Sequence, residues 1–109
     1  MRGLRKKGVL ILGSGNIVHN LREMAWEDTA YDWALAFDAR IKGLILSGDH
    51  KAIIDYSKLG RSARLSMPTP EHYLPLLYVL GTQDDSDRVA FFADKVTLGS
   101  MSMRSVKIG

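Results

Sequence analysis

The sequence predicts an α/β fold, part of a mixed sheet with flanking helices, in a single domain covering residues 1–109. An apolar run at residues 9–12 ends at a glycine pair and is typical of a buried strand. Apolar side chains recur at helical spacing over residues 33–44, and residues 89–92 favour another strand. Because strand and helix patterns interleave along the chain, the class is α/β.

Composition limits the chemistry of the chain. The absence of cysteine excludes disulfides, thiolate metal sites and cysteine nucleophiles, so a metal would need histidine, carboxylate or water ligands. The net charge of +3 comes largely from basic residues at 2–7, and no basic and aromatic side chains interleave, so we expect no nucleic-acid partner. No stretch is long enough to span a membrane, and we expect a cytoplasmic protein.

A candidate histidine follows the first predicted strand. Gly13 and Gly15 tolerate positive φ and lack side chains, so the backbone can turn there and approach a ligand closely. His19 follows the expected carboxyl end of the strand, where open α/β sheets bind ligands. His19 is therefore a candidate site residue, and the alternative is a structural, hydrogen-bonded histidine.

Two nucleotide-binding motifs are excluded at this glycine turn. A dinucleotide fingerprint needs a third glycine where Val18 stands, and no acidic residue follows a second strand at the expected distance. A phosphate-binding loop would need Gly-Lys-Ser or Gly-Lys-Thr after the glycines, and neither occurs.

Two helices are predicted next. Thr29 and Asp32 resemble a capping box that opens the first helix. Its apolar stripe, interpreted as core rather than as a ligand box, comprises Trp33, Phe37, Ile41 and Leu44. Asp49 caps a second, short helix that ends by Gly60, with His50 as a solvated residue in its first turn. Residues 61–67 are interpreted as a polar connection.

A third helix carries the second candidate histidine. Thr69 is expected as its N-cap, Pro70 at its first position and Gly81 at its end. His72 then falls in the first turn, where the helix dipole keeps the ring neutral and able to bind a metal. Pro75 removes an amide and is expected to loosen this turn.

The carboxyl-terminal third predicts strands. An acidic surface loop at residues 83–88 precedes the strand at 89–92. Residues 96–108 alternate apolar and polar side chains with a phase slip near Gly99 and Ser100, which indicates two strand pieces joined by a bulge or bend.

Three motifs carry a family resemblance. They read Leu-Gly-Ser-Gly-Asn-Ile-Val-His-Asn-Leu at residues 12–21, Pro-Thr-Pro-Glu-His-Tyr-Leu-Pro-Leu-Leu at 68–77 and Gly-Ser-Met-Ser-Met-Arg-Ser-Val-Lys-Ile-Gly at 99–109. In this order and spacing they resemble the carboxyl-terminal part of the 4,5-DOPA extradiol dioxygenase family, within the class III, protocatechuate 4,5-dioxygenase-like superfamily. The resemblance covers nearly the whole chain.

The resemblance implies a non-haem metal enzyme that opens a catechol ring beside its hydroxyls with O2. Iron(II) is the working metal of the family, and zinc(II) is found in prepared proteins. His72 matches a metal-ligand histidine, and His19 matches a histidine beside the metal that acts as acid and base or as a further ligand. Glu71 is the alternative to His72, because the wider superfamily uses a glutamate ligand, and adjacent helical residues point in different directions.

The resemblance also predicts an incomplete protein. Family members are more than twice as long, and their first metal-binding histidines lie in an amino-terminal half with a His-Gly-Ser motif that this sequence lacks. We therefore expect the chain alone to be inactive, and to form a homo-oligomer or to associate with a missing amino-terminal half. The alternative function is a non-catalytic oligomeric or partner-binding remnant of the fold.

Overall fold

The computed structural model describes residues 1–109. The helices are α1 (Arg2–Lys6), α2 (Asp32–Ser47), α3 (His50–Ile54), α4 (Arg61–Ser66) and α5 (Leu74–Leu80), with short 3-10 helices η1 (Leu21–Glu23) and η2 (Tyr56–Leu59). The strands are β1 (Val89–Phe92), β2 (Val96–Thr97), β3 (Met101–Ser102) and β4 (Ser105–Ile108). The predicted mixture of helices and strands is confirmed, and the strands form two antiparallel pairs, β1 with β4 and β2 with β3.

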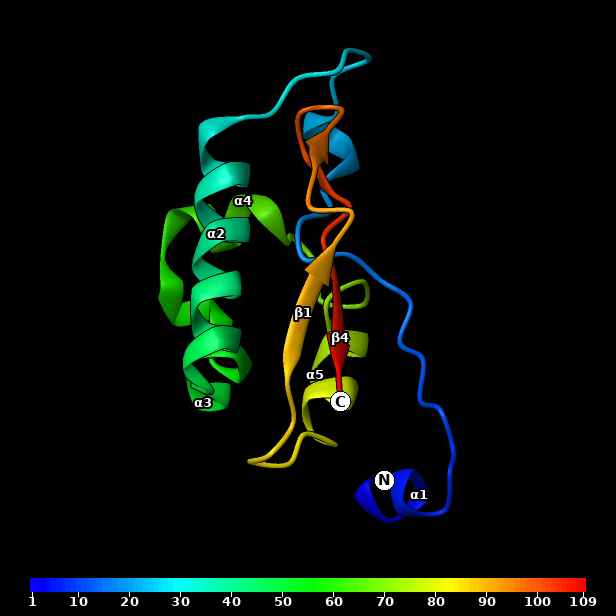
Figure 1. Cartoon of the computed structure of the whole chain (residues 1–109). Helices are drawn as coiled ribbons and strands as arrows, with labels where there is room; N and C mark the ends of the chain where they lie inside the picture. Colours follow the sequence, from blue (N-terminus) through cyan, green and yellow to red (C-terminus); the bar gives the residue numbers. More distant parts are fainter.

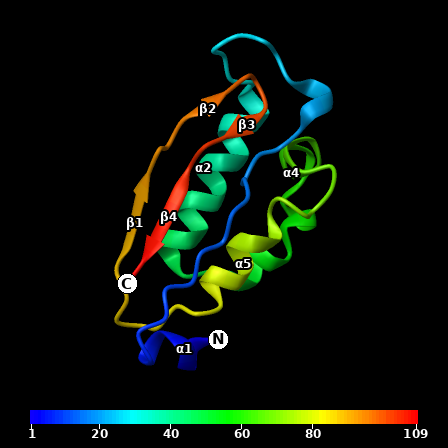
Figure 2. The same cartoon turned by 90° about the vertical axis from the view of Figure 1, so that its right-hand side faces the viewer.

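The elements form an elongated molecule with principal extents of 43 × 26 × 21 Å. Helix α2 lies along the β1–β4 pair (Figure 1), and α5 lies beyond β4 (Figure 2). The amino-terminal segment runs without regular structure between β4 and α5, as Figure 2 shows. None of the helices combines the length and the apolar character needed to cross a bilayer.

Helix α2 confirms the helical stripe. Phe37, Ile41 and Ile45 are buried at the centre of the core, because residues three or four apart share one face of a helix. The helix ends at Gly48, which takes the left-handed conformation at φ 72°. The predicted capping box is wrong, because the N-cap is Tyr31 and no side chain caps the helix.

The next two helices include one that the sequence did not indicate. The Asp49 carboxylate accepts a 3.1 Å hydrogen bond from the Ala52 N–H and confirms the predicted cap of α3. The polar connection predicted at residues 61–67 is wrong, because α4 forms there and packs against α2. Its buried residues are the small Ala63 and Ser66, so it carries no stripe of large apolar side chains.

Helix α5 is shorter than predicted. It begins at Leu74, so the expected cap at Thr69 and first position at Pro70 are wrong. Pro75 lies at the start of the helix, where its missing N–H breaks no helical hydrogen bond, and the predicted loosening does not occur. The predicted end at Gly81 is confirmed.

The strand predicted at residues 9–12 is absent. Leu10 and Leu12 are 79% and 83% exposed. No backbone group of residues 10–15 forms a hydrogen bond within the chain, because no strand lies alongside this segment. The apolar pattern is therefore that of a strand whose pairing partner this chain does not contain.

The bend predicted in the last segment is confirmed. Strands β2 and β3 form a hairpin whose turn contains Leu98 and Gly99 at φ 51° and 73°. A Cβ on Gly99 would lie 2.5 Å from the ring of Tyr31, so this position requires glycine. The predicted strand at 89–92 is also confirmed as β1, and it pairs with β4.

The amino terminus is attached to the loop that precedes β1. Arg5 binds Asp87 through both terminal guanidinium nitrogens, and it also donates to the Thr82 carbonyl. The hydrogen bond from Arg5 is the main reason that the pKa of Asp87 falls to about 2.

Arg5→Ala is expected to destabilise the fold more at neutral pH than at pH 2, where only the hydrogen bond to the Thr82 carbonyl remains to be lost. The pKa of Asp87 is depressed in the folded chain, so its stabilising contribution is complete above the ordinary carboxyl pKa and disappears as the pH falls to about 2. Urea unfolding at pH 7, 4 and 2 measures the difference. Lys6→Ala, at an exposed lysine without an ion pair, is the control, and an Arg5→Ala effect independent of pH would contradict this account.

Candidate functional site

The two candidate histidines lie together. The imidazole centroids of His19 and His72 are 3.6 Å apart, and the ring planes differ by 19°, so the rings stack. Both side chains are half-buried. The structure thus joins two residues from distant parts of the sequence at one place, as the sequence interpretation expects.

Backbone contacts hold His19 in position. Its N–H donates to the Ser66 carbonyl over 2.8 Å, and the residue forms an isolated antiparallel bridge with Met101. The buried Asn20 donates its side-chain amide to the Leu65 carbonyl over 2.6 Å. The end of α4 and the start of β3 therefore fix the histidine from two sides.

His72 lies in the turn before α5. Its carbonyl accepts a 2.7 Å hydrogen bond from the Asn16 N–H, while the Asn16 side chain donates to the Ser102 carbonyl over 2.7 Å. The next residue, Tyr73, is fully buried and donates its hydroxyl to the Ile53 carbonyl over 2.6 Å. Asn16 thus joins three segments at the site. Sequence reasoning missed it, although its place directly after the second glycine was a usable signal.

The two glycines act by close packing. Neither Gly13 nor Gly15 has positive φ, so the turn predicted from that conformation is wrong, whereas the close approach predicted from the missing side chains occurs against the chain's own backbone. A Cβ on Gly15 would lie 2.1 Å from the His72 carbonyl oxygen, and a Cβ on Gly13 would lie 2.8 Å from that of Pro75. The glycines therefore allow the amino-terminal segment to lie directly against the backbone at the start of α5.

The environment favours a neutral His19. Burial lowers the pKa of His19 below 6.5, and the adjacent His72 lowers it further. A neutral imidazole has a nitrogen lone pair that can accept a proton or bind a metal. The Glu71 side chain is exposed, and a hydrogen bond from the Thr69 hydroxyl, 2.7 Å long, is the main cause of its lowered pKa. Its charge acts on both imidazoles.

The residues present do not make a complete metal site. No group of three or more histidine and carboxylate side chains in the chain is arranged to hold an ion. His19 and His72 are nitrogen donors of the type that iron and zinc accept, but there are two of them. Stacked, nearly parallel rings also direct their in-plane lone pairs side by side rather than toward one point.

The third histidine lies outside this site. His50 is half-buried, and its Nε2 lies 2.9 Å from the side-chain oxygen of Gln83. The expected solvated position is therefore wrong, because the side chain has a partner within the chain. His50 is available as a control histidine in experiments on the other two.

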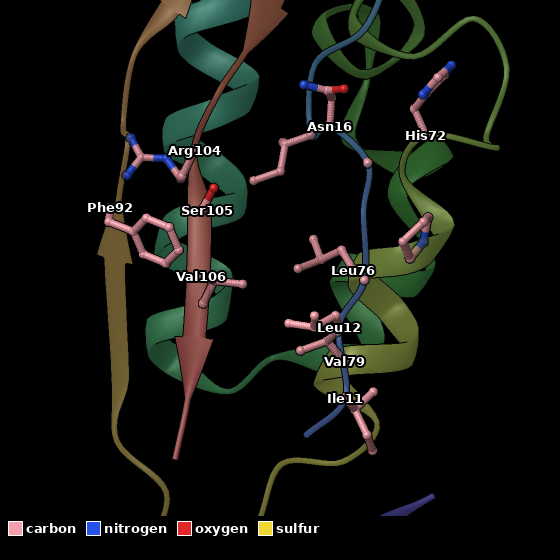
Figure 3. Close-up of a pocket in the computed structure, with 14 residues that line it drawn as sticks. Ile11, Leu12, Asn16, His72, Leu76, Val79, Phe92, Arg104, Ser105 and Val106 are labelled. Atoms are coloured by element: carbon pink, nitrogen blue, oxygen red, sulfur yellow. The ribbon is translucent and has the colours of Figure 1, made fainter. Parts of the chain in front are cut away.

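A cavity of about 220 Å³ adjoins His72 (Figure 3). His72 and Asn16 lie at one end, and Leu12 and Val106 line opposite walls. Arg104 also lines it, and sequence reasoning missed this residue because a single arginine in a strand region carries no pattern.

Comparison with known proteins supports the resemblance. No family model matches the chain. A protein named 4,5-DOPA dioxygenase extradiol from Escherichia coli K12 is 40% identical over 114 residues, which cover 100% of this chain and 42% of that protein. A protein of the same name from Portulaca grandiflora is 31% identical over 110 residues, or 96% of this chain and 41% of the relative.

A solved structure from E. coli also resembles this chain. The crystal structure of an uncharacterized protein from Escherichia coli K12 superposes with a TM-score of 0.91 and 37% identity, covering 99% of this chain and 46% of the other. The chain thus spans less than half the length of each of these relatives. The match to the longer E. coli sequence is to its carboxyl-terminal part. The chain is therefore similar over its whole length to the carboxyl-terminal part of proteins named 4,5-DOPA dioxygenase extradiol.

Proposed function

We propose that this chain forms the carboxyl-terminal part of an extradiol dioxygenase that opens a catechol ring with O2. In this proposal His72 is a ligand of a non-haem iron(II) ion, and His19 is the acid and base or a further ligand. The remaining ligands come from polypeptide outside these 109 residues. The proximity of His19 and His72, whose ring centroids lie 3.6 Å apart, is the observation that carries the proposal.

The roles follow from what each side chain can do. Iron(II) with open coordination positions supplies the place where a catechol and O2 react. His19, held neutral by its surroundings, can take a proton from a catechol hydroxyl and return one later in the reaction. His72 is favoured over Glu71 as the ligand, because the Glu71 carboxylate is exposed and already accepts the Thr69 hydroxyl.

A chimera tests the proposal. In it, this chain replaces the matched carboxyl-terminal part of the E. coli relative, and the protein is supplied with iron(II), a catechol and air. We expect a yellow ring-opened product from the chimera and none from the 109-residue chain alone. His72→Ala is expected to reduce bound iron at least about tenfold by metal analysis. His19→Ala is expected to reduce turnover about 10²–10⁴-fold, as loss of an acid and base does.

Two controls separate the outcomes. His50→Ala should leave iron content and turnover unchanged, because His50 lies outside the histidine pair. Retention of both iron and turnover by His72→Ala would overturn the proposal. A chimera that assembles but yields no product would favour a second function, a non-catalytic partner-binding module, which the lack of a three-ligand group in this chain also favours.

A further inference from the structure

The groove between the amino-terminal segment and β4 has an unpaired backbone edge on each side. Residues 10–15 form no backbone hydrogen bond within the chain. Strand β4 pairs with β1 along one edge, and no backbone hydrogen bond reaches its other edge. Each free edge is able to bind an added strand.

The part of this groove that its two cavities share is lined by apolar side chains. The cavity beside His72 and a second cavity of about 230 Å³ share Ile11, Leu12, Val79, Phe92 and Val106 as lining residues. Leu12 and Val106 face the gap from its two sides (Figure 3), and Val79 of α5 also lines it. An apolar stretch between two unpaired edges fits one extended chain that forms hydrogen bonds with both edges.

We propose that this groove receives one β-strand from the amino-terminal polypeptide of the family, the part that lies outside the match to this chain. The segment at residues 10–15 runs away from α1, whereas β4 runs back toward it (Figure 2). One inserted strand is therefore parallel to one neighbour and antiparallel to the other. The result is a mixed sheet, with the residues at 9–12 as one of its strands.

The relatives favour this occupant over a second copy of the chain. The superposition with the E. coli crystal structure covers 99% of this chain but only 46% of the other protein. The fold of this chain is therefore retained in a protein that contains much more polypeptide. The histidine pair lies at one end of the groove and lacks further ligands. One polypeptide that supplies both a strand and the further ligands would complete the sheet and the metal site together. The identity of the partner rests on the proposed function, whereas the unpaired edges do not.

Hydrogen exchange on the chimera defined above tests the inference. The amides of residues 10–12 should exchange about a hundredfold more slowly in the chimera than in the isolated chain, because pairing protects them from solvent. Leu12→Pro should reduce this protection at least tenfold, since proline has no N–H and no hydrogen bond within the chain uses this one. Leu12→Ala, which keeps the N–H, is the matched control and should retain protection.

Other outcomes decide against the inference. Unprotected amides at residues 10–12 in a folded chimera would overturn it, as would dimers of the isolated chain with the same amides protected. If the chimera does not fold, the two polypeptides are co-expressed, and the absence of a one-to-one complex would overturn it. The readout is independent of iron and turnover, so a protected but inactive chimera would contradict the proposed function alone.

Discussion

Replacing Asp38 by alanine is expected to lower the free energy of unfolding by about 3–5 kcal/mol, the usual cost of breaking a buried ion pair. Asp38 is 4% exposed, and its carboxylate accepts hydrogen bonds from Arg104 Nε at 2.9 Å, Arg104 Nη2 at 2.7 Å and Ser102 Oγ at 2.6 Å. Without it the buried guanidinium has no counter-charge, and its Nη1 already lacks a partner. Urea unfolding at neutral pH measures the loss.

A double variant distinguishes the lost pair from lost packing. Asp38→Leu with Arg104→Met removes both charges and keeps apolar volume, so it should be less destabilised than Asp38→Ala. A loss below about 1 kcal/mol for Asp38→Ala would place the pair among solvent-screened surface pairs and contradict its burial.

The Asp38 network also supports the histidine site. Ser102, which donates to Asp38, accepts the Asn16 amide on its carbonyl and donates its own N–H to the Val18 carbonyl. Val18 directly precedes His19. Helix α2 therefore fixes the strand that holds the amino-terminal segment, and a change at Asp38 should be transmitted to the imidazole pair.

Local sequence patterns predicted a helix or strand correctly where its apolar face is buried against other parts of this chain. The stripe at Phe37 and Ile41 predicted α2 because a helix needs one apolar face, and the core of the same chain covers it. The Asp49 cap and the strand β1 were also predicted, since they depend on neighbouring residues. Helix α4 was missed because its contact with α2 uses the small residues Ala63 and Ser66.

The amino-terminal segment shows why the remaining features, such as the structure of residues 9–12, could not be predicted from the sequence. Its apolar residues have the pattern of a buried strand, but Leu10 and Leu12 are exposed because burial depends on a neighbour that the chain lacks. The glycine turn likewise suggested ligand approach, while Gly15 actually approaches the His72 backbone. His19 and His72 were each singled out by their local positions, and the family motifs then assigned both to one metal site, which no spacing rule could do for residues so far apart. Their catalytic roles stay predictions.

Gly15→Ala is expected to separate the two imidazoles and to reduce turnover of the chimera by about a hundredfold, as a shift near 1 Å at an active site can. The new Cβ would lie 2.1 Å from the carbonyl oxygen of His72 and 3.0 Å from its carbonyl carbon. Both are backbone atoms at the start of α5 and cannot rotate away. The segment must retreat, which breaks the 2.7 Å hydrogen bond from the Asn16 N–H and moves His19 relative to His72.

Gly43→Ala is the matched control, because a Cβ at Gly43 meets no atom within 4 Å. In the interior of α2 this change should stabilise the chain by about 0.5–1 kcal/mol, since alanine loses less backbone entropy than glycine. Proton NMR of the imidazoles reports the stack directly, because each ring lies in the ring-current field of the other. Unchanged imidazole shifts and full turnover in Gly15→Ala would mean that the contact between the amino-terminal segment and α5 does not position the histidines. Changed shifts with full turnover would instead mean that the stacked arrangement is not the one that reacts.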